Sequence, residues 1–131
     1  MRLKTTALFF LIAIMSMAQS QVPQWEQFET SFTLHTAKNP FTDVTLKATF
    51  THAVSGKVIT VDGFYDGDDT YRIRFMPTEQ GKWTYMTRSS EQAMSGKTGA
   101  IECVKPINHG MVSAGMDHDF HYADGTPYRP V

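Results

Sequence analysis

The chain has 131 residues, 12 of them basic and 13 acidic, so its formal charge at neutral pH is -1. A nearly balanced charge provides no field that would attract nucleic acid or an anionic membrane surface, and both classes of partner are excluded. The single cysteine, Cys103, excludes an internal disulfide, so the fold must be held together by its core.

The first 20 residues have the features of a secretory signal peptide. Arg2 and Lys4 precede an apolar run, residues 7–18, that is too short to span a bilayer. Small residues allow signal peptidase to cut after Ala18 or after Ser20. We therefore expect an exported protein, periplasmic or extracellular, with no membrane attachment after cleavage; an uncleaved N-terminal anchor is the alternative.

The 111 residues that follow predict one domain built from strands. A chain of that length buries roughly two thirds of its unfolded surface, enough for one core and too little for two. Alternation with a period of two residues recurs between short turns, and no helical period is sustained after residue 20.

The first predicted strand is WEQFETSFTL, which starts at Trp25. Phe28, Phe32 and Leu34 share one face of this strand, but Trp25 falls on the other face. Trp25 therefore lies beyond a bulge or is exposed to solvent.

Two strands joined by a hairpin come next. In DVTLKATFT, apolar residues alternate with a polar face, so one side is core and the other is solvated. The polar face consists of Thr45, Lys47, Thr49 and Thr51. The strand KVITVDGFY follows a turn at Ser55 and Gly56, and a bulge or bend is expected at Gly63.

Two more half-buried strands follow the turn DGDD at Asp66. In TYRIRF the apolar residues alternate with Arg72 and Arg74, which point outward. The residues of TYRIRF predicted to be buried are Tyr71, Ile73 and Phe75. In KWTYMTRS the predicted inner residues are Trp83, Tyr85 and Thr87, and the outer ones are Lys82, Thr84, Met86 and Arg88.

The next strand is TGAIECVKP, and the polar stretch before it, residues 89–97, predicts a mobile loop. Cys103 has the same parity as Ile101, which predicts a buried thiol. About seven short strands over a little more than 100 residues match an immunoglobulin-like antiparallel β-sandwich.

The segment MDHDFHYAD gathers side chains that could bind zinc or calcium. These are Asp117, His118, Asp119, His121 and Asp124. In a strand, His118 and His121 point to opposite faces and do not converge on one ion. A solvated strand that leads into a turn is therefore favoured, and we expect neither a metal site nor a cofactor.

Catalytic motifs are also missing from the sequence. It contains no Gly-x-Ser-x-Gly elbow, Walker loop or paired-cysteine motif. The carboxylates fall mainly in turns and on solvated strand faces, which do not suit general acid catalysis. We expect no catalytic residue in this chain.

Several segments together resemble a known family. They are NPFTDVTLKATF from Asn39, GFYDGDDTYRIRFMPTEQGKWTY from Gly63, HGMV from His109 and FHYADGTPYRPV from Phe120. In this order they are similar to the N-terminal immunoglobulin-like domain of unknown function that precedes apiosidase-like (β/α)8 glycoside hydrolase domains in bacterial secreted enzymes. The resemblance runs from about Trp25 to the end of the chain.

The resemblance implies a division of the chain into a signal peptide at 1–20, a sandwich at 21–117 and a truncated lead-in to a missing catalytic barrel at 118–131. It implies that the chain is the non-catalytic accessory fragment of a secreted glycoside hydrolase, whose C-terminal barrel is its partner. Trp25, Arg72 and Arg74 are the candidates for contact with carbohydrate or with the barrel. The alternatives are a free-standing module that binds polysaccharide and a structural or adhesive β-sandwich.

Overall fold

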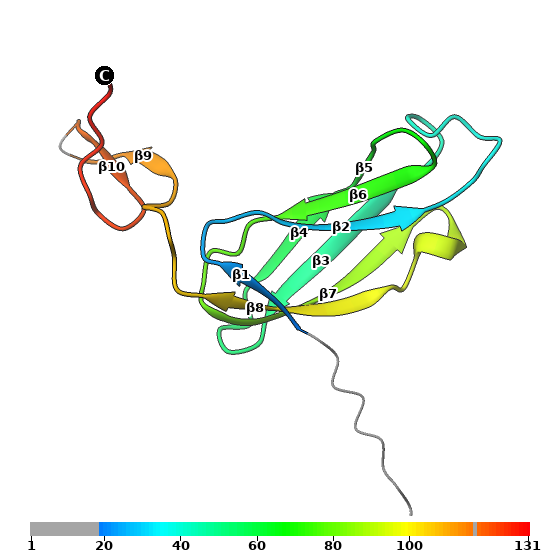
Figure 1. The fold of residues 1–131 in the computed structure, drawn as a ribbon, viewed down its shortest axis with the longest axis horizontal. Coiled ribbons are helices and arrows are strands. Elements are labelled where there is room, and N and C mark those ends of the chain that lie inside the picture. Colours follow the sequence, from blue (N-terminus) through cyan, green and yellow to red (C-terminus); the bar gives the residue numbers. More distant parts are fainter. Residues whose placement is uncertain (1–18, 117) are drawn as a thin grey trace, which may run out of the picture.

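The structure, a computed structural model, describes residues 19–116 and 118–131. This part of the chain forms ten strands and one short 3-10 helix, arranged in three sheets (Figure 1). The predicted signal peptide lies outside the described residues except for Gln19 and Ser20. No helix in the described part is long and apolar enough to cross a membrane.

The larger sheet has five strands in the order β1-β8-β7-β3-β4. Their bounds are β1 (Ser20–Pro23), β8 (Thr98–Val104), β7 (Gly81–Ser89), β3 (Leu46–His52) and β4 (Val58–Asp62). All neighbours in this sheet are antiparallel except β1 and β8, which run parallel.

A three-stranded sheet, in the order β2-β6-β5, covers one face of the larger sheet (Figure 1). Its strands are β2 (Phe28–Thr33), β6 (Thr70–Phe75) and β5 (Phe64–Tyr65). The third sheet is a separate hairpin of β9 (Val112–Ala114) and β10 (Phe120–Tyr122). The predicted all-β sandwich is confirmed, with more strands than the seven expected and with one parallel pair; its immunoglobulin-like type stays a prediction.

Gly63 is the point at which the chain passes from one sheet to the other, between β4 and β5. Its backbone nitrogen donates a hydrogen bond to the Leu46 carbonyl oxygen at 2.7 Å. A Cβ atom at this position would lie 2.7 Å from Cδ2 of Leu46, so only glycine allows the approach. The bend expected at Gly63 is confirmed.

An aromatic stack in the core joins the two sheets. The ring of Phe50 on β3 stacks on that of Phe75 on β6, with centroids 3.8 Å apart and planes within 8°. Trp83 on β7 packs edge-on against Phe75 at 5.1 Å, and its indole nitrogen donates to the Glu79 carbonyl oxygen. All three side chains are at most 3% exposed, so water is excluded from the space between the sheets.

The predicted inner residues of β6 and β7 lie in or against this core. Cys103 is also buried, and its burial raises the pKa of the thiol to about 11, so the prediction of a buried thiol is confirmed. Residues 89–97 differ from the predicted loop because they contain a 3-10 helix, η1 (Gln92–Met94). Met94 is buried there, and its carbonyl oxygen accepts a 2.6 Å hydrogen bond from the Thr87 hydroxyl.

We expect the aromatic stack to contribute strongly to the stability of the folded chain. Phe75→Ala should lower the free energy of unfolding of the full chain by about 3–5 kcal/mol, because a buried ring is replaced by a cavity. Val58→Ala, at a side chain that is largely exposed, should cost about 0.5 kcal/mol or less. Urea denaturation measures the free energy of unfolding of both variants. Equal losses of stability in the two would show that the stack does not hold the sheets together.

Candidate functional site

The C-terminal segment, residues 107–131, folds on itself beside the sandwich (Figure 1). The nitrogen of Tyr122 donates to the Thr126 carbonyl oxygen, and that of Tyr128 donates to the Phe120 carbonyl oxygen, both at 2.8 Å. Gly125 has φ +87° in the turn between them, a conformation that suits glycine. The predicted strand that leads into a turn is confirmed, while the expected domain boundary at residue 117 falls between β9 and β10 in the sequence, inside one hairpin.

His109 and Asp124 fix the start of this segment to its turn. Nδ1 of His109 lies 2.7 Å from Oδ2 of Asp124. This hydrogen bond, assisted by hydrogen bonds from Thr126, lowers the pKa of Asp124 to about 2. Among the described residues, no group of three or more His, Cys, Asp or Glu side chains is placed to hold a metal ion, and Asp117 lies outside that part of the chain.

Trp25 joins the sandwich to the C-terminal segment. It lies in a turn before β2 with φ +67°, and its backbone nitrogen donates to the Pro77 carbonyl oxygen at 3.0 Å. The indole packs so closely on Gly110 that a Cβ atom there would lie 2.7 Å from Cδ2 of Trp25 and 2.7 Å from Cβ of Ala123. Trp25 is thus half-buried, and it is out of phase because β2 begins only at Phe28.

A polar contact reinforces this packing. Nδ2 of Asn108 donates to Oε1 of Glu26 at 2.5 Å. We refer to Trp25, Glu26, Asn108, Gly110 and Ala123 together as the junction. The sequence pattern indicated only Trp25 of this set, because Asn108, Gly110 and Ala123 lie more than 80 residues away from it along the chain.

Arg72 and Arg74 share one carboxylate on the outer face of the three-stranded sheet. They donate to the two carboxylate oxygens of Glu29, each at 2.7 Å, and Arg72 also donates to Asp66 at 2.5 Å. The hydrogen bond from Arg74 is the largest of the effects that lower the pKa of Glu29. The Arg74 guanidinium also lies 4.8 Å from the Phe64 ring centroid.

The three candidate residues from the sequence therefore do not form one site. Within the described part of the chain, no hydrogen bond, ring contact or ion pair joins Trp25 to Arg72 or Arg74. Trp25 belongs to the junction, and the arginines belong to a charged network with Glu29 and Asp66. Their contact with carbohydrate or with another domain stays a prediction.

Exposed apolar side chains gather in the C-terminal segment. Among the described residues, six of the ten large apolar side chains that are largely exposed lie in residues 107–131. They are Ile107, Met111, Val112, Met116, Phe120 and Val131. The concentration of exposed apolar side chains in one short segment is typical of a surface that another structure covers.

Residues 21–90 match the model of a family described as a domain of unknown function, DUF5060. The chain is also similar to a crystal structure of a "putative glycoside hydrolase" from Bacteroides vulgatus, at 48% identity and a TM-score of 0.80. The match covers 86% of this chain and 22% of that one, so the chain spans about a fifth of the length of the protein it resembles. No curated protein matches the chain.

The junction predicts different effects for two glycine substitutions. Gly110 and Gly56 both have positive φ, at +80° and +71°, so alanine strains the backbone at either position. Only at Gly110 does the new Cβ atom collide with the Trp25 ring, because nothing lies within 4 Å of it at Gly56.

We therefore expect chymotrypsin to cut residues 108–128 of Gly110→Ala severalfold faster than those of Gly56→Ala, since detachment of the segment exposes it. Equal cleavage rates in the two variants would contradict the role of the junction.

Proposed function

The chain belongs to the DUF5060 family, and we propose that it is a non-catalytic accessory domain of a secreted glycoside hydrolase. The sandwich would dock onto the catalytic domain of the same polypeptide through its C-terminal segment, residues 107–131. The resemblance stated above supports a (β/α)8 barrel of the apiosidase-like type as that catalytic domain.

The apolar surface of residues 107–131 is the observation that carries this proposal. These side chains lie outside the sandwich core, because each is at least 41% exposed and, among the described strands, β9 and β10 pair only with each other. About four fifths of the similar Bacteroides vulgatus chain lies outside the match. This supports a large neighbouring domain as the structure that covers the apolar side chains. Domains within one polypeptide commonly meet over surfaces of this mixed character.

The state of the carboxyl groups supports a non-catalytic role. A glycosidase needs one carboxyl group with a raised pKa to protonate the leaving group and a second one nearby. In the described part of the chain, the carboxyl groups with a clearly shifted pKa are Glu29, Glu79 and Asp124, and all three shift downward. The largest cause in each is a hydrogen bond, from Arg74, Ser55 and His109 respectively.

Export of the protein is part of the proposal and rests on the sequence of residues 1–20. Cleavage after Ala18 would leave all of β1, whereas cleavage after Ser20 would remove the residue that pairs with Ile101. We expect the exported protein to begin at Gln19, which N-terminal sequencing would show. A mature chain that begins at Gln21, or one that keeps Met1, would contradict this expectation.

A chimera tests the docking. The matched segment of the Bacteroides vulgatus protein is replaced by this chain, and thermal unfolding is followed by calorimetry. Docked domains should unfold together in one transition. Met111→Ser combined with Phe120→Ser should split it into two transitions, because polar side chains weaken an apolar interface.

The matched control is Val54→Ser combined with Val58→Ser, which changes two exposed apolar side chains on the sandwich and should leave a single transition. Two transitions in the chimera without substitutions would contradict the docking. Hydrolysis of a glycoside by this chain alone would contradict the non-catalytic role.

A further inference from the structure

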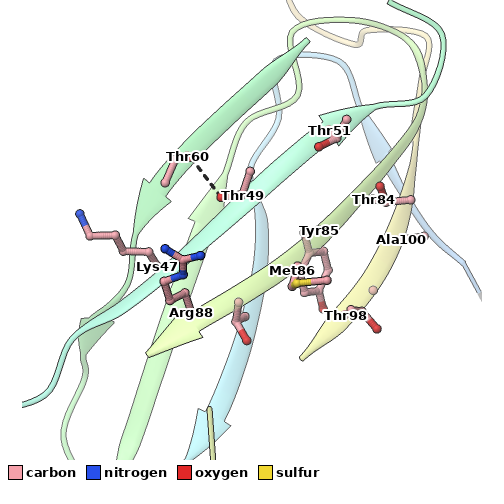
Figure 2. A pocket seen from close by; sticks show the side chains of 12 residues that line it. Lys47, Thr49, Thr51, Thr60, Thr84, Tyr85, Met86, Arg88, Thr98 and Ala100 are labelled. Atoms are coloured by element: carbon pink, nitrogen blue, oxygen red, sulfur yellow. Dashed lines mark hydrogen bonds between the residues drawn. The ribbon is translucent and has the colours of Figure 1, made fainter. Parts of the chain in front are cut away.

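The outer face of the five-stranded sheet is hollowed, on the side away from β2, β6 and β5 (Figure 2). The hollow has a volume of about 890 Å³ and is lined by residues of β3, β4, β7 and β8. Four adjacent strands span roughly 14 Å across the sheet, at about 4.8 Å between neighbours. The face is therefore a broad, open surface that suits an extended ligand better than a small enclosed one.

Two cations meet at one end of this hollow. Lys47 on β3 and Arg88 on β7 are direct cross-strand partners, and Figure 2 shows both side chains on the same face. Like charges placed directly opposite each other destabilise a sheet. Their juxtaposition therefore has no explanation in the stability of the fold.

Only one of the two cations is neutralised. Nζ of Lys47 lies 3.0 Å from Oδ1 of Asp62 on β4. Within the described residues, the side chain of Arg88 forms no ion pair or hydrogen bond, so it presents its guanidinium to solvent beside the Lys47–Asp62 pair. A guanidinium binds carboxylate and sulfate groups through two parallel hydrogen bonds.

The rest of the face offers hydroxyl groups. Its threonines come from four strands, and all but the half-buried Thr51 are exposed: Thr49, Thr51, Thr60, Thr84 and Thr98. The hydroxyls of Thr49 and Thr60 are 3.1 Å apart, so each can donate to or accept from a further polar group. Met86, which is 58% exposed, lies between Thr49 and Thr98 and adds an apolar contact to the face.

We propose that this face binds a polysaccharide that carries carboxylate or sulfate groups, with the acidic group at Arg88 and Lys47 and the sugar hydroxyls on the threonines. The choice of a polysaccharide rests on the proposed function, and the acidic class follows from the unpaired cation. Eight of the twelve residues that line the hollow are lysine, arginine or threonine, whereas a groove for a protein helix is lined mainly by apolar side chains. The balanced charge of the chain leaves no wider basic surface for nucleic acid.

Affinity electrophoresis of the full chain tests the inference. The probes are polygalacturonate and dextran sulfate, each compared with its uncharged counterpart, methyl-esterified polygalacturonate or plain dextran. We expect the chain to be retarded by at least one acidic polymer and by neither counterpart. The acidic polymer that retards it identifies carboxylate or sulfate as the recognised group.

Arg88→Gln should weaken this binding by about tenfold or more, since it removes a charge-assisted bidentate contact from an exposed position. The matched control is Lys105→Gln, which removes the same charge from an exposed side chain outside the hollow and should leave binding unchanged. Thr49→Val with Thr84→Val should also weaken binding, because it removes hydroxyls with little change of shape.

Equal weakening by Arg88→Gln and Lys105→Gln would show general charge attraction and would overturn the inference, as would no retardation by either acidic polymer. The glycan-binding experiment and the docking experiment can fail independently of each other. A chimera that unfolds in one transition beside a chain that binds no glycan contradicts only this inference, and glycan binding beside two independent transitions contradicts only the docking.

Discussion

The stacking of Phe50 on Phe75 is the contact on which the two sheets depend, because no disulfide is available to join them. Dispersion and water exclusion around these rings and Trp83 replace a covalent link. The stack also determines which faces are free. With the inner faces buried together, the outer face of each sheet and the C-terminal segment remain for contact with other molecules.

The free surfaces differ in chemistry, and this difference suggests a division of roles. The C-terminal segment carries six exposed apolar side chains and is tied to the sandwich through Trp25 and Gly110, so movement of a docked domain would reach the sandwich through the junction. The hollowed face offers threonine hydroxyls and carries an unpaired cation at Arg88. An accessory domain with both surfaces could hold a substrate chain near a catalytic domain without contributing to the chemistry.

The sequence was sufficient to predict what depends on local alternation. The burial of Tyr71, Ile73 and Phe75 follows from a period of two, and the bend at Gly63 follows from a glycine between two strands. Contacts between distant segments were not predictable in this way. The sequence places Lys47 and Arg88 on solvated faces, but only the register of β3 and β7 sets them opposite each other. The half-burial of Trp25 was likewise not predictable, because the residue that its ring packs on, Gly110, is 85 positions away along the chain.

Two further features had no periodic signal at all. Met94 is the one large apolar side chain in residues 89–97, and β1, in which Val22 is buried, is a short strand at the boundary of the expected signal peptide. The central claim is that the C-terminal segment is an interface, and hydrogen exchange of β9 and β10 tests it most directly. In the chain alone, these amides should exchange faster than those of β3. In the chimera with the Bacteroides vulgatus protein, they should become protected. Equal exchange of β9 and β10 in both proteins would contradict the account.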